Sequence, residues 1–162
     1  MIADSDYQVG DLALAPGMGA LFGLAASAAM LAVLLMLQPL TGRGLEQVLG
    51  QVGGLLLPQG APGAVAAGLV VHLVIGMVCG VLYALAQQRA PERYLLAVGV
   101  FYGLLIWVVG SLLLLVFSEA LRPVFRSLGW LVCCLAYGAS LAGLAAWQQR
   151  RQGGGLAVMP KD

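Results

Sequence analysis

Four long apolar stretches constrain every fold that this sequence can adopt. They cover residues 17–40, 62–87, 94–117 and 124–148, and the first three contain no Asp, Glu, Lys or Arg. An α-helix needs about 20 mostly apolar residues to cross the hydrocarbon core of a bilayer. A strand of a membrane β-barrel would be about ten residues long and would alternate apolar with polar side chains. The sequence therefore predicts an all-α integral membrane protein, a bundle of four transmembrane helices.

The composition of the whole chain agrees with this prediction. Of its 162 residues, 61% are hydrophobic and 9% are charged, whereas soluble domains are about half apolar and about a quarter charged. A soluble domain of this size could not bury so much apolar surface, so the lipid bilayer is the expected surrounding. The net charge of +1 gives no basic surface for nucleic acid, and we expect no nucleic-acid partner.

The apolar stretches divide the chain into three parts. Residues 1–16 are predicted to form an acidic N-terminal tail, since they carry three Asp and no Lys or Arg. That charge pattern does not resemble a cleaved signal peptide, which has a positive start. Residues 17–149 form the predicted transmembrane domain, and residues 150–162 are expected to be a flexible C-terminal tail.

An even number of spans places both termini on the same side of the membrane. That side holds five Lys and Arg residues and the other side holds three: Arg89, Arg93, Arg150, Arg151 and Lys161 against Arg43, Arg122 and Arg126. Because the excess of positive charge normally stays in the cytoplasm, we expect a bacterial inner membrane protein with cytoplasmic termini.

The connector after the first stretch has a pattern of its own. Within residues 44–57 the apolar side chains recur at helical spacing, and Glu46, Gln47 and Gln51 occupy the other faces. Such a stripe is typical of an amphipathic helix. Two placements are open: the helix lies along the membrane surface, or it packs back onto the bundle.

The spans also contain evidence of an internal duplication. Residues 19–24 align with residues 99–104 at an offset of 80, and residues 72–76 align with residues 134–138 at an offset of 62. The first connector, residues 41–61, is 15 residues longer than the third, residues 118–123, and this accounts for most of the difference of 18 between the two offsets. We therefore expect two related hairpins in parallel orientation, unlike the inverted repeats of many transporters.

Small residues follow each other at four-residue spacing in every span. In lipid there is little hydrophobic drive between helices, so small residues that permit close approach define the contacts. We expect these stripes to pack within the chain rather than against a partner. The predicted helix-packing residues are Gly19, Gly23, Gly76, Gly80, Gly99, Gly103 and Gly138.

His72 is the most polar residue at membrane depth and the only histidine. An ionisable group within a span is a candidate functional residue. His72 is therefore the one candidate cofactor-binding residue, for a haem iron or a quinone oxygen, and it is also a candidate proton relay. The structural interpretation is a neutral imidazole that hydrogen-bonds a neighbouring helix, with Ser27, Tyr102 and Tyr137 as the possible partners. A haem with two histidine ligands would need a second His from another chain.

The rest of the chain offers no reactive group in a catalytic setting. Cys133 and Cys134 are adjacent, so their side chains diverge on a helix and lack the spacing of a metal or redox pair. No Asp or Glu lies deep in a span, and the serines have no acidic or basic partner that would activate a nucleophile. We expect no enzyme, no catalytic residue, no metal site and no resident cofactor.

The second span carries a recognisable run of residues. His72, Leu73, Gly76, Gly80 and Tyr83 form the pattern His-Leu-x-x-Gly-x-x-x-Gly-x-x-Tyr. This run resembles a segment of the YagU-like proteins, small polytopic membrane proteins of unknown function. The resemblance implies the same helical membrane fold and no particular activity, and the fourth span has Cys134 where a second histidine would stand.

The expected function follows by elimination. Small-residue packing on every span, without chemistry of its own, favours a non-catalytic accessory or assembly subunit of a larger membrane complex, with an energy-converting complex as the preferred kind. The partners would be other membrane subunits or further copies of the chain. One alternative is a small oligomeric transporter or channel with His72 near the pathway, and another is a haem- or quinone-binding subunit.

Overall fold

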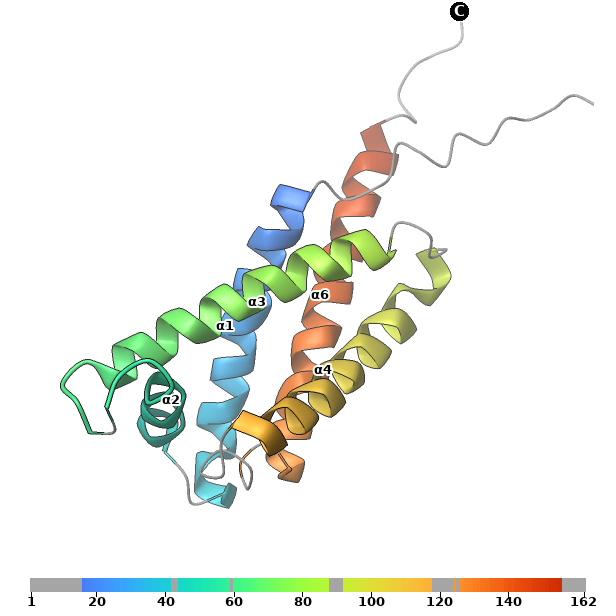
Figure 1. The fold of residues 1–162 in the computed structure, drawn as a ribbon. Helices are drawn as coiled ribbons and strands as arrows, with labels where there is room; N and C mark the ends of the chain where they lie inside the picture. Colours follow the sequence, from blue (N-terminus) through green and yellow to red (C-terminus); the bar gives the residue numbers. More distant parts are fainter. Residues whose placement is uncertain are drawn as a thin grey trace, which may run out of the picture.

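The protein consists of helices alone in the part that this computed structural model describes, residues 16–41, 44–58, 60–87, 92–117, 124 and 126–155. The acidic tail, most of the two short connectors and the end of the C-terminal tail lie outside these residues. Four helices are long, namely α1 (Pro16–Thr41), α3 (Ala64–Gln87), α4 (Leu95–Phe117) and α6 (Leu128–Gly155), and two are short, α2 (Leu45–Gly53) and η1 (Glu92–Tyr94) (Figure 1).

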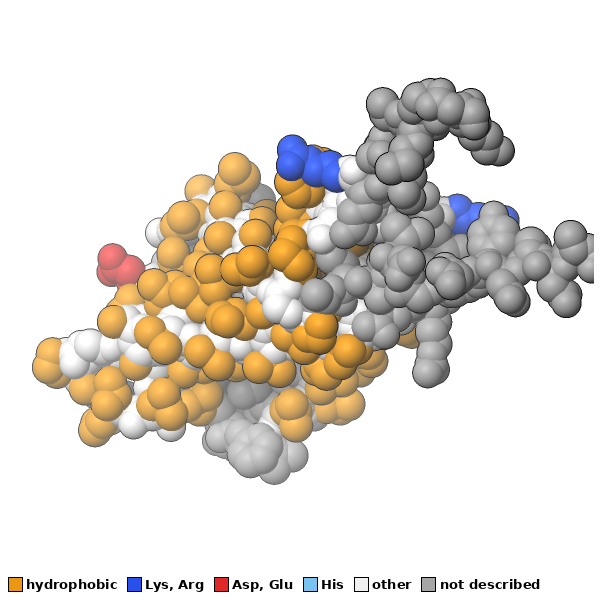
Figure 2. Space-filling view, turned by 90° about the horizontal axis from the view of Figure 1, so that it is seen from above, with side chains coloured by type: hydrophobic (Ala, Val, Ile, Leu, Met, Phe, Trp, Pro, Cys, Tyr) orange, Lys and Arg blue, Asp and Glu red, His pale blue; other side chains and the backbone are white. Residues whose placement is uncertain are grey.

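The long helices match the four predicted spans and confirm the helical bundle. Each of them is long and apolar enough to cross a membrane, and in lipid a helix is the local structure that satisfies its own backbone hydrogen bonds. Hydrophobic side chains cover most of the described part of the face seen in Figure 2, and the few charged side chains stand at its rim. The class of fold is therefore that of an integral membrane bundle.

The last helix differs in its bounds from the predicted span of 124–148. It begins later because Ser127 caps it: the Ser127 Oγ accepts the backbone N–H of Trp130 at 3.2 Å, as an N-cap side chain does. It also continues to Gly155, so the predicted C-terminal tail is helical in its first residues. A helix of 28 residues is about 42 Å long, longer than the hydrocarbon core.

Arg151 lies at the polar end of α6. Its guanidinium carbon is 3.9 Å from the centre of the Trp147 ring, a cation–π contact. Tryptophan side chains gather at the membrane–water interface, so this pair indicates where α6 leaves the hydrocarbon.

Helices α1 and α3 cross through glycines. A Cβ atom placed on Gly19 would lie 2.6 Å from the Cβ of Ala84 and 2.8 Å from the carbonyl oxygen of Gly80. Gly23 is equally close to Gly76, where a Cβ atom would overlap the carbonyl oxygen. Backbone touches backbone here, so the small-residue stripe of α3 packs against α1 within the chain, as we expected.

Helices α4 and α6 cross in a similar way. A Cβ atom on Gly99 would lie 2.5 Å from the carbonyl oxygen of Gly138 and 2.6 Å from the Cβ of Ala142. Gly103 lies against the backbone of Cys134. All seven predicted helix-packing glycines thus lie at one of the two crossings.

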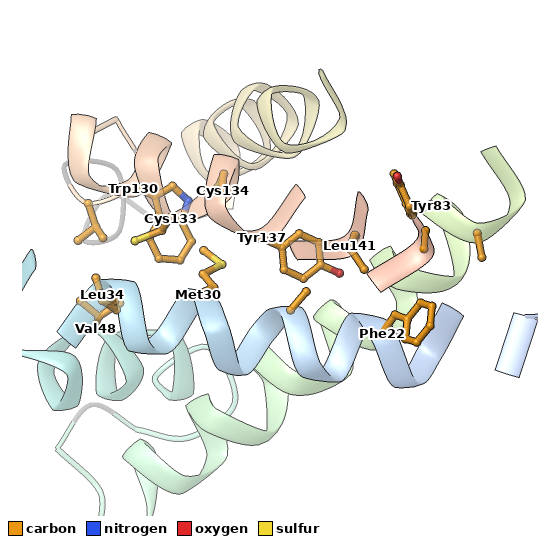
Figure 3. Packing of buried hydrophobic residues seen from close by; sticks show 14 residues of the cluster. Phe22, Met30, Leu34, Val48, Tyr83, Trp130, Cys133, Cys134, Tyr137 and Leu141 are labelled. Atoms are coloured by element: carbon orange, nitrogen blue, oxygen red, sulfur yellow. The ribbon is translucent and has the colours of Figure 1, made fainter. Parts of the chain in front are cut away.

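A third contact joins α1 to α6 and forms the core. It is made by buried side chains, most of them large, that recur at four-residue spacing on α1 and at three- or four-residue spacing on α6 (Figure 3). Its buried members include Phe22, Ala26, Met30 and Leu34 on α1, and Trp130, Cys133, Tyr137 and Leu141 on α6. The bundle is therefore two glycine-packed pairs, α1–α3 and α4–α6, joined through α1 and α6.

The amphipathic connector packs back onto the bundle. Val48 and Leu49 of α2 are buried, and a Cβ atom on Gly53 would overlap the carbonyl oxygen of Ala64 in α3. Helix α2 ends at Gly53 and a turn follows, so the helix is shorter than the predicted 44–57. The loop to α3 uses Gly60 and Gly63 at φ 78° and 95°, a conformation that glycine adopts at little cost.

Candidate functional site

A groove lies between α3 and α4, the two long helices that are consecutive in the chain. Its volume is about 270 Å³. Residues from every long helix and from the α2 region line it, and they are Ser27, Met30, Val52, Leu55, Val71, His72, Ile75, Gly76, Cys79, Ile106, Gly110, Leu113, Trp130 and Tyr137.

The groove exists because α3 and α4 meet at one end only. There the Tyr83 hydroxyl donates to the carbonyl oxygen of Leu95 at 3.4 Å, and the rings of Tyr83 and Tyr102 are 5.3 Å apart. Away from that end the two helices diverge (Figure 1), since α3 follows its glycine contact with α1 and α4 follows its contact with α6. The space between them opens sideways, toward the hydrocarbon of the bilayer.

Two tyrosine hydroxyls tie the second helix pair to α3. Tyr102 of α4 donates to the carbonyl oxygen of Cys79, and Tyr137 of α6 donates to the carbonyl oxygen of Gly76, both at 2.6 Å. Buried tyrosine hydroxyls usually find such a partner. Tyr102 and Tyr137 were expected among the possible partners of His72, but both donate to the backbone of α3 instead. The sequence does not show which backbone a tyrosine faces.

The bond from Tyr137 can be tested by removing its donor. We expect Tyr137→Phe to lower the free energy of unfolding by about 1 kcal/mol, in the range of interhelical hydrogen bonds in membranes. Unfolding in mixed micelles titrated with sodium dodecyl sulfate measures it. Tyr94→Phe is the matched control, since the Tyr94 ring is exposed and no hydrogen bond of its hydroxyl is found among the described residues. Equal effects of the two substitutions would contradict the role of the Tyr137 hydroxyl.

His72 lies on α3 and forms part of the groove wall. Its Nε2 is 3.5 Å from the backbone carbonyl oxygen of Ser27 on α1, a long and therefore weak hydrogen bond. Ser27 is one of the three partners that we expected, although the contact is to its backbone and not to its side chain. A carbonyl oxygen only accepts, so a neutral imidazole that makes this bond carries its ring hydrogen on Nε2 and has Nδ1 as its acceptor.

The Ser27 hydroxyl is the second polar group at the groove. Ser27 is fully buried, and its Oγ has no hydrogen-bond partner in the structure as far as it is described. It faces Gly76, where an added Cβ atom would overlap it. The glycine at this position therefore makes room for the hydroxyl between the two helices.

The cysteines and the other potential metal ligands of the described residues do not form a site. Cys133 and Cys134 are buried with free thiols, Cys79 is half-buried, and the described residues hold no group of three or more His, Cys, Asp or Glu side chains that could bind a metal ion. No carboxylate or lysine lines the groove. The groove itself was missed, since only the divergence of α3 and α4 creates it.

The fold and the groove together define a polytopic α-helical membrane protein. Residues 14–153 match DUF6789, a family of unknown function, and the chain belongs to this family. No curated protein and no solved structure matches the chain. The resemblance to YagU-like proteins stays a prediction.

Proposed function

We propose that the protein is a non-catalytic accessory or assembly subunit of a larger membrane complex. The observation that carries this proposal is the chemistry of the groove, whose lining residues include no acid, lysine or cluster of metal ligands. Such a groove can hold an apolar molecule, but its His72 and Tyr137 side chains each bond a backbone carbonyl oxygen and not each other, so they form no acid–base pair with which to transform it. An energy-converting complex is the kind we favour, because a groove that opens into hydrocarbon suits a lipid-soluble carrier.

Isolation in mild detergent tests this proposal. We expect further membrane polypeptides to copurify in fixed ratio, identified by mass spectrometry. His72→Ala should leave the association intact, since His72 is part of the groove wall and its imidazole bonds the Ser27 backbone of the same chain. A chain that purifies alone as a homogeneous monomer contradicts the proposal.

A second candidate function is a subunit that binds a lipid-soluble ligand through His72. The specific observation in its favour is that the imidazole lines the groove and makes one weak hydrogen bond. A visible absorption spectrum and mass spectrometry of extracted lipids would reveal a bound haem or quinone. Purified protein that retains only bulk phospholipid contradicts this candidate.

The buried polar groups support the transporter alternative less well than they support the two functions above. Ser27 and Gln87 are the buried polar side chains of the described residues. Ser27 faces Gly76, and Gln87 lies 11 residues further along α3, about 16 Å away at 1.5 Å per residue. Two polar groups so far apart do not outline a continuous pathway.

For membrane placement, we propose the bacterial inner membrane with cytoplasmic termini. The described cations support this orientation: Arg93, Arg150 and Arg151 stand at the end of the bundle where α6 ends, and Arg126 stands where it begins. Labelling of a C-terminal tag with a membrane-impermeant reagent tests it, since a tag labelled in intact cells would refute it.

We also propose that the two helix pairs arose by duplication. Glycine-to-carbonyl contacts at both crossings support it. The contact register differs, however: Gly19 faces Gly80 and Ala84, whereas Gly99 faces Gly138 and Ala142. At the offset of 62, Gly138 corresponds to Gly76, so the second pair is displaced by one helical turn relative to the first.

A further inference from the structure

We infer that the α3–α4 groove binds a lipid-soluble molecule with one hydroxylated ring, of the hydroquinone class, whose hydroxyl donates to Nδ1 of His72. The inference rests on the second candidate function and names its ligand class and its binding atoms. Three properties of the groove carry it: its volume, the chemistry of its wall and its opening.

The volume of the groove is suited to a ligand with a single ring. An engineered apolar cavity of about 150 Å³ is sufficient for benzene, so a groove of about 270 Å³ holds one substituted ring and several further carbons. A porphyrin contains four pyrrole rings and needs much more space. This comparison favours a ring of the quinone type over the haem.

The chemistry of the groove wall favours an uncharged ring that donates a hydrogen bond. Most of the groove is aliphatic, with Val71, Ile75, Ile106 and Leu113 among its residues, and a charged group in such surroundings is strongly disfavoured. The His72 Nε2 is directed to the Ser27 carbonyl oxygen, so Nδ1 is the acceptor, and no donor to it is found among the residues that the structure describes. A hydroquinone hydroxyl supplies this donor, whereas a quinone carbonyl only accepts and would need the Ser27 hydroxyl, which is fully buried against Gly76.

The opening accommodates the tail. Ile75 of α3 and Leu113 of α4 border the groove and are 56% and 53% exposed. In the membrane their exposed atoms contact hydrocarbon. A prenyl tail can therefore leave the groove between α3 and α4 without crossing a polar surface.

The test measures binding of three tritiated probes to the full-length protein in lipid nanodiscs by scintillation proximity. The probes are a prenylated hydroquinone kept reduced, its dimethyl ether, and a linear alcohol with the same number of carbons. We expect the hydroquinone to bind about threefold to tenfold more tightly than the ether, the size of one hydrogen bond within a membrane. The linear alcohol should bind more weakly than both.

Three variants locate the site. His72→Phe should remove the preference for the hydroquinone and leave the binding of the ether unchanged. Ile75→Trp fills the groove and should weaken both ring probes at least tenfold. Val74→Trp is the matched control, because Val74 is the neighbouring exposed residue and is not part of the groove wall; it should change neither affinity.

Several outcomes would overturn the inference. Equal binding of the hydroquinone and the ether would exclude the hydrogen bond, and equal binding of the linear alcohol would exclude the ring. Equal effects of the two Trp variants would show that the groove is not the binding site. Should His72→Phe not fold, as judged by circular dichroism, the comparison of the Trp variants still decides the location. A lipid extract that contains another ring lipid, with no affinity for the hydroquinone, supports the second candidate function and refutes this ligand class.

Discussion

Gly23→Ala should lower the free energy of unfolding by about 3 kcal/mol, the upper part of the usual range for overpacking. The new methyl group would overlap the backbone carbonyl of Gly76 and come within 3.0 Å of the Gly80 Cα atom. Backbone atoms cannot rotate away as a flexible side chain can, so α1 and α3 must separate. Titration of the bundle with sodium dodecyl sulfate, followed by circular dichroism, measures the loss.

Gly143→Ala is the control for this substitution. Gly143 lies on α6, and a Cβ atom placed there would have no neighbour within 4 Å. Both substitutions gain the same helix propensity, about 1 kcal/mol in favour of Ala in water, so their difference isolates the close contact. A Gly23→Ala protein as stable as the Gly143→Ala protein would refute the packing of α1 on α3.

Gly53→Ala should detach α2 from the bundle without unfolding the long helices. The added methyl group would overlap the carbonyl oxygen of Ala64 and lie 2.9 Å from the backbone nitrogen of Gly68. A local cost of about 3 kcal/mol corresponds to roughly hundredfold faster hydrogen exchange at the Val48 and Leu49 amides. Hydrogen exchange with mass spectrometry in nanodiscs measures this change.

Gly50→Ala provides the comparison on the same helix. A Cβ atom on Gly50 would meet only the Val65 side chain, at 3.7 Å, an ordinary van der Waals distance. We expect its exchange rates not to rise, because alanine favours the helix by about 1 kcal/mol over glycine. If Gly53→Ala behaved in the same way, α2 would not be packed on α3 and the surface placement would be the better description.

The small-residue stripes were the part of the packing that the sequence predicted well. Gly19 and Gly23 lie at the crossing with α3, and Gly99 and Gly103 at the crossing with α6. These positions could be predicted because close approach in lipid requires small residues. The large side chains of the α1–α6 core were not predicted. Residues such as Met30 and Leu34 are of the same types as the lipid-facing residues beside them, so the sequence does not distinguish the two.

Of the candidate site, the sequence predicted one residue, His72, but not the groove around it. His72 stood out because it is polar at membrane depth, and Ser27 was among its expected partners. The groove could not be predicted, since it depends on the angle at which α3 leaves its contact with α1. The tyrosine bonds to Gly76 and Cys79 depend on the same arrangement.

The sequence by itself determined the number of spans, their approximate bounds and the small residues at two helix crossings. The reason is that a long apolar run in lipid must satisfy its backbone hydrogen bonds within a single helix. The tertiary structure alone decided which helices pair, where the core lies and where the bundle stays open. Hydrocarbon and a neighbouring helix are almost equally favourable surroundings for Leu or Val, so hydropathy does not distinguish the inner face of a span from the outer one.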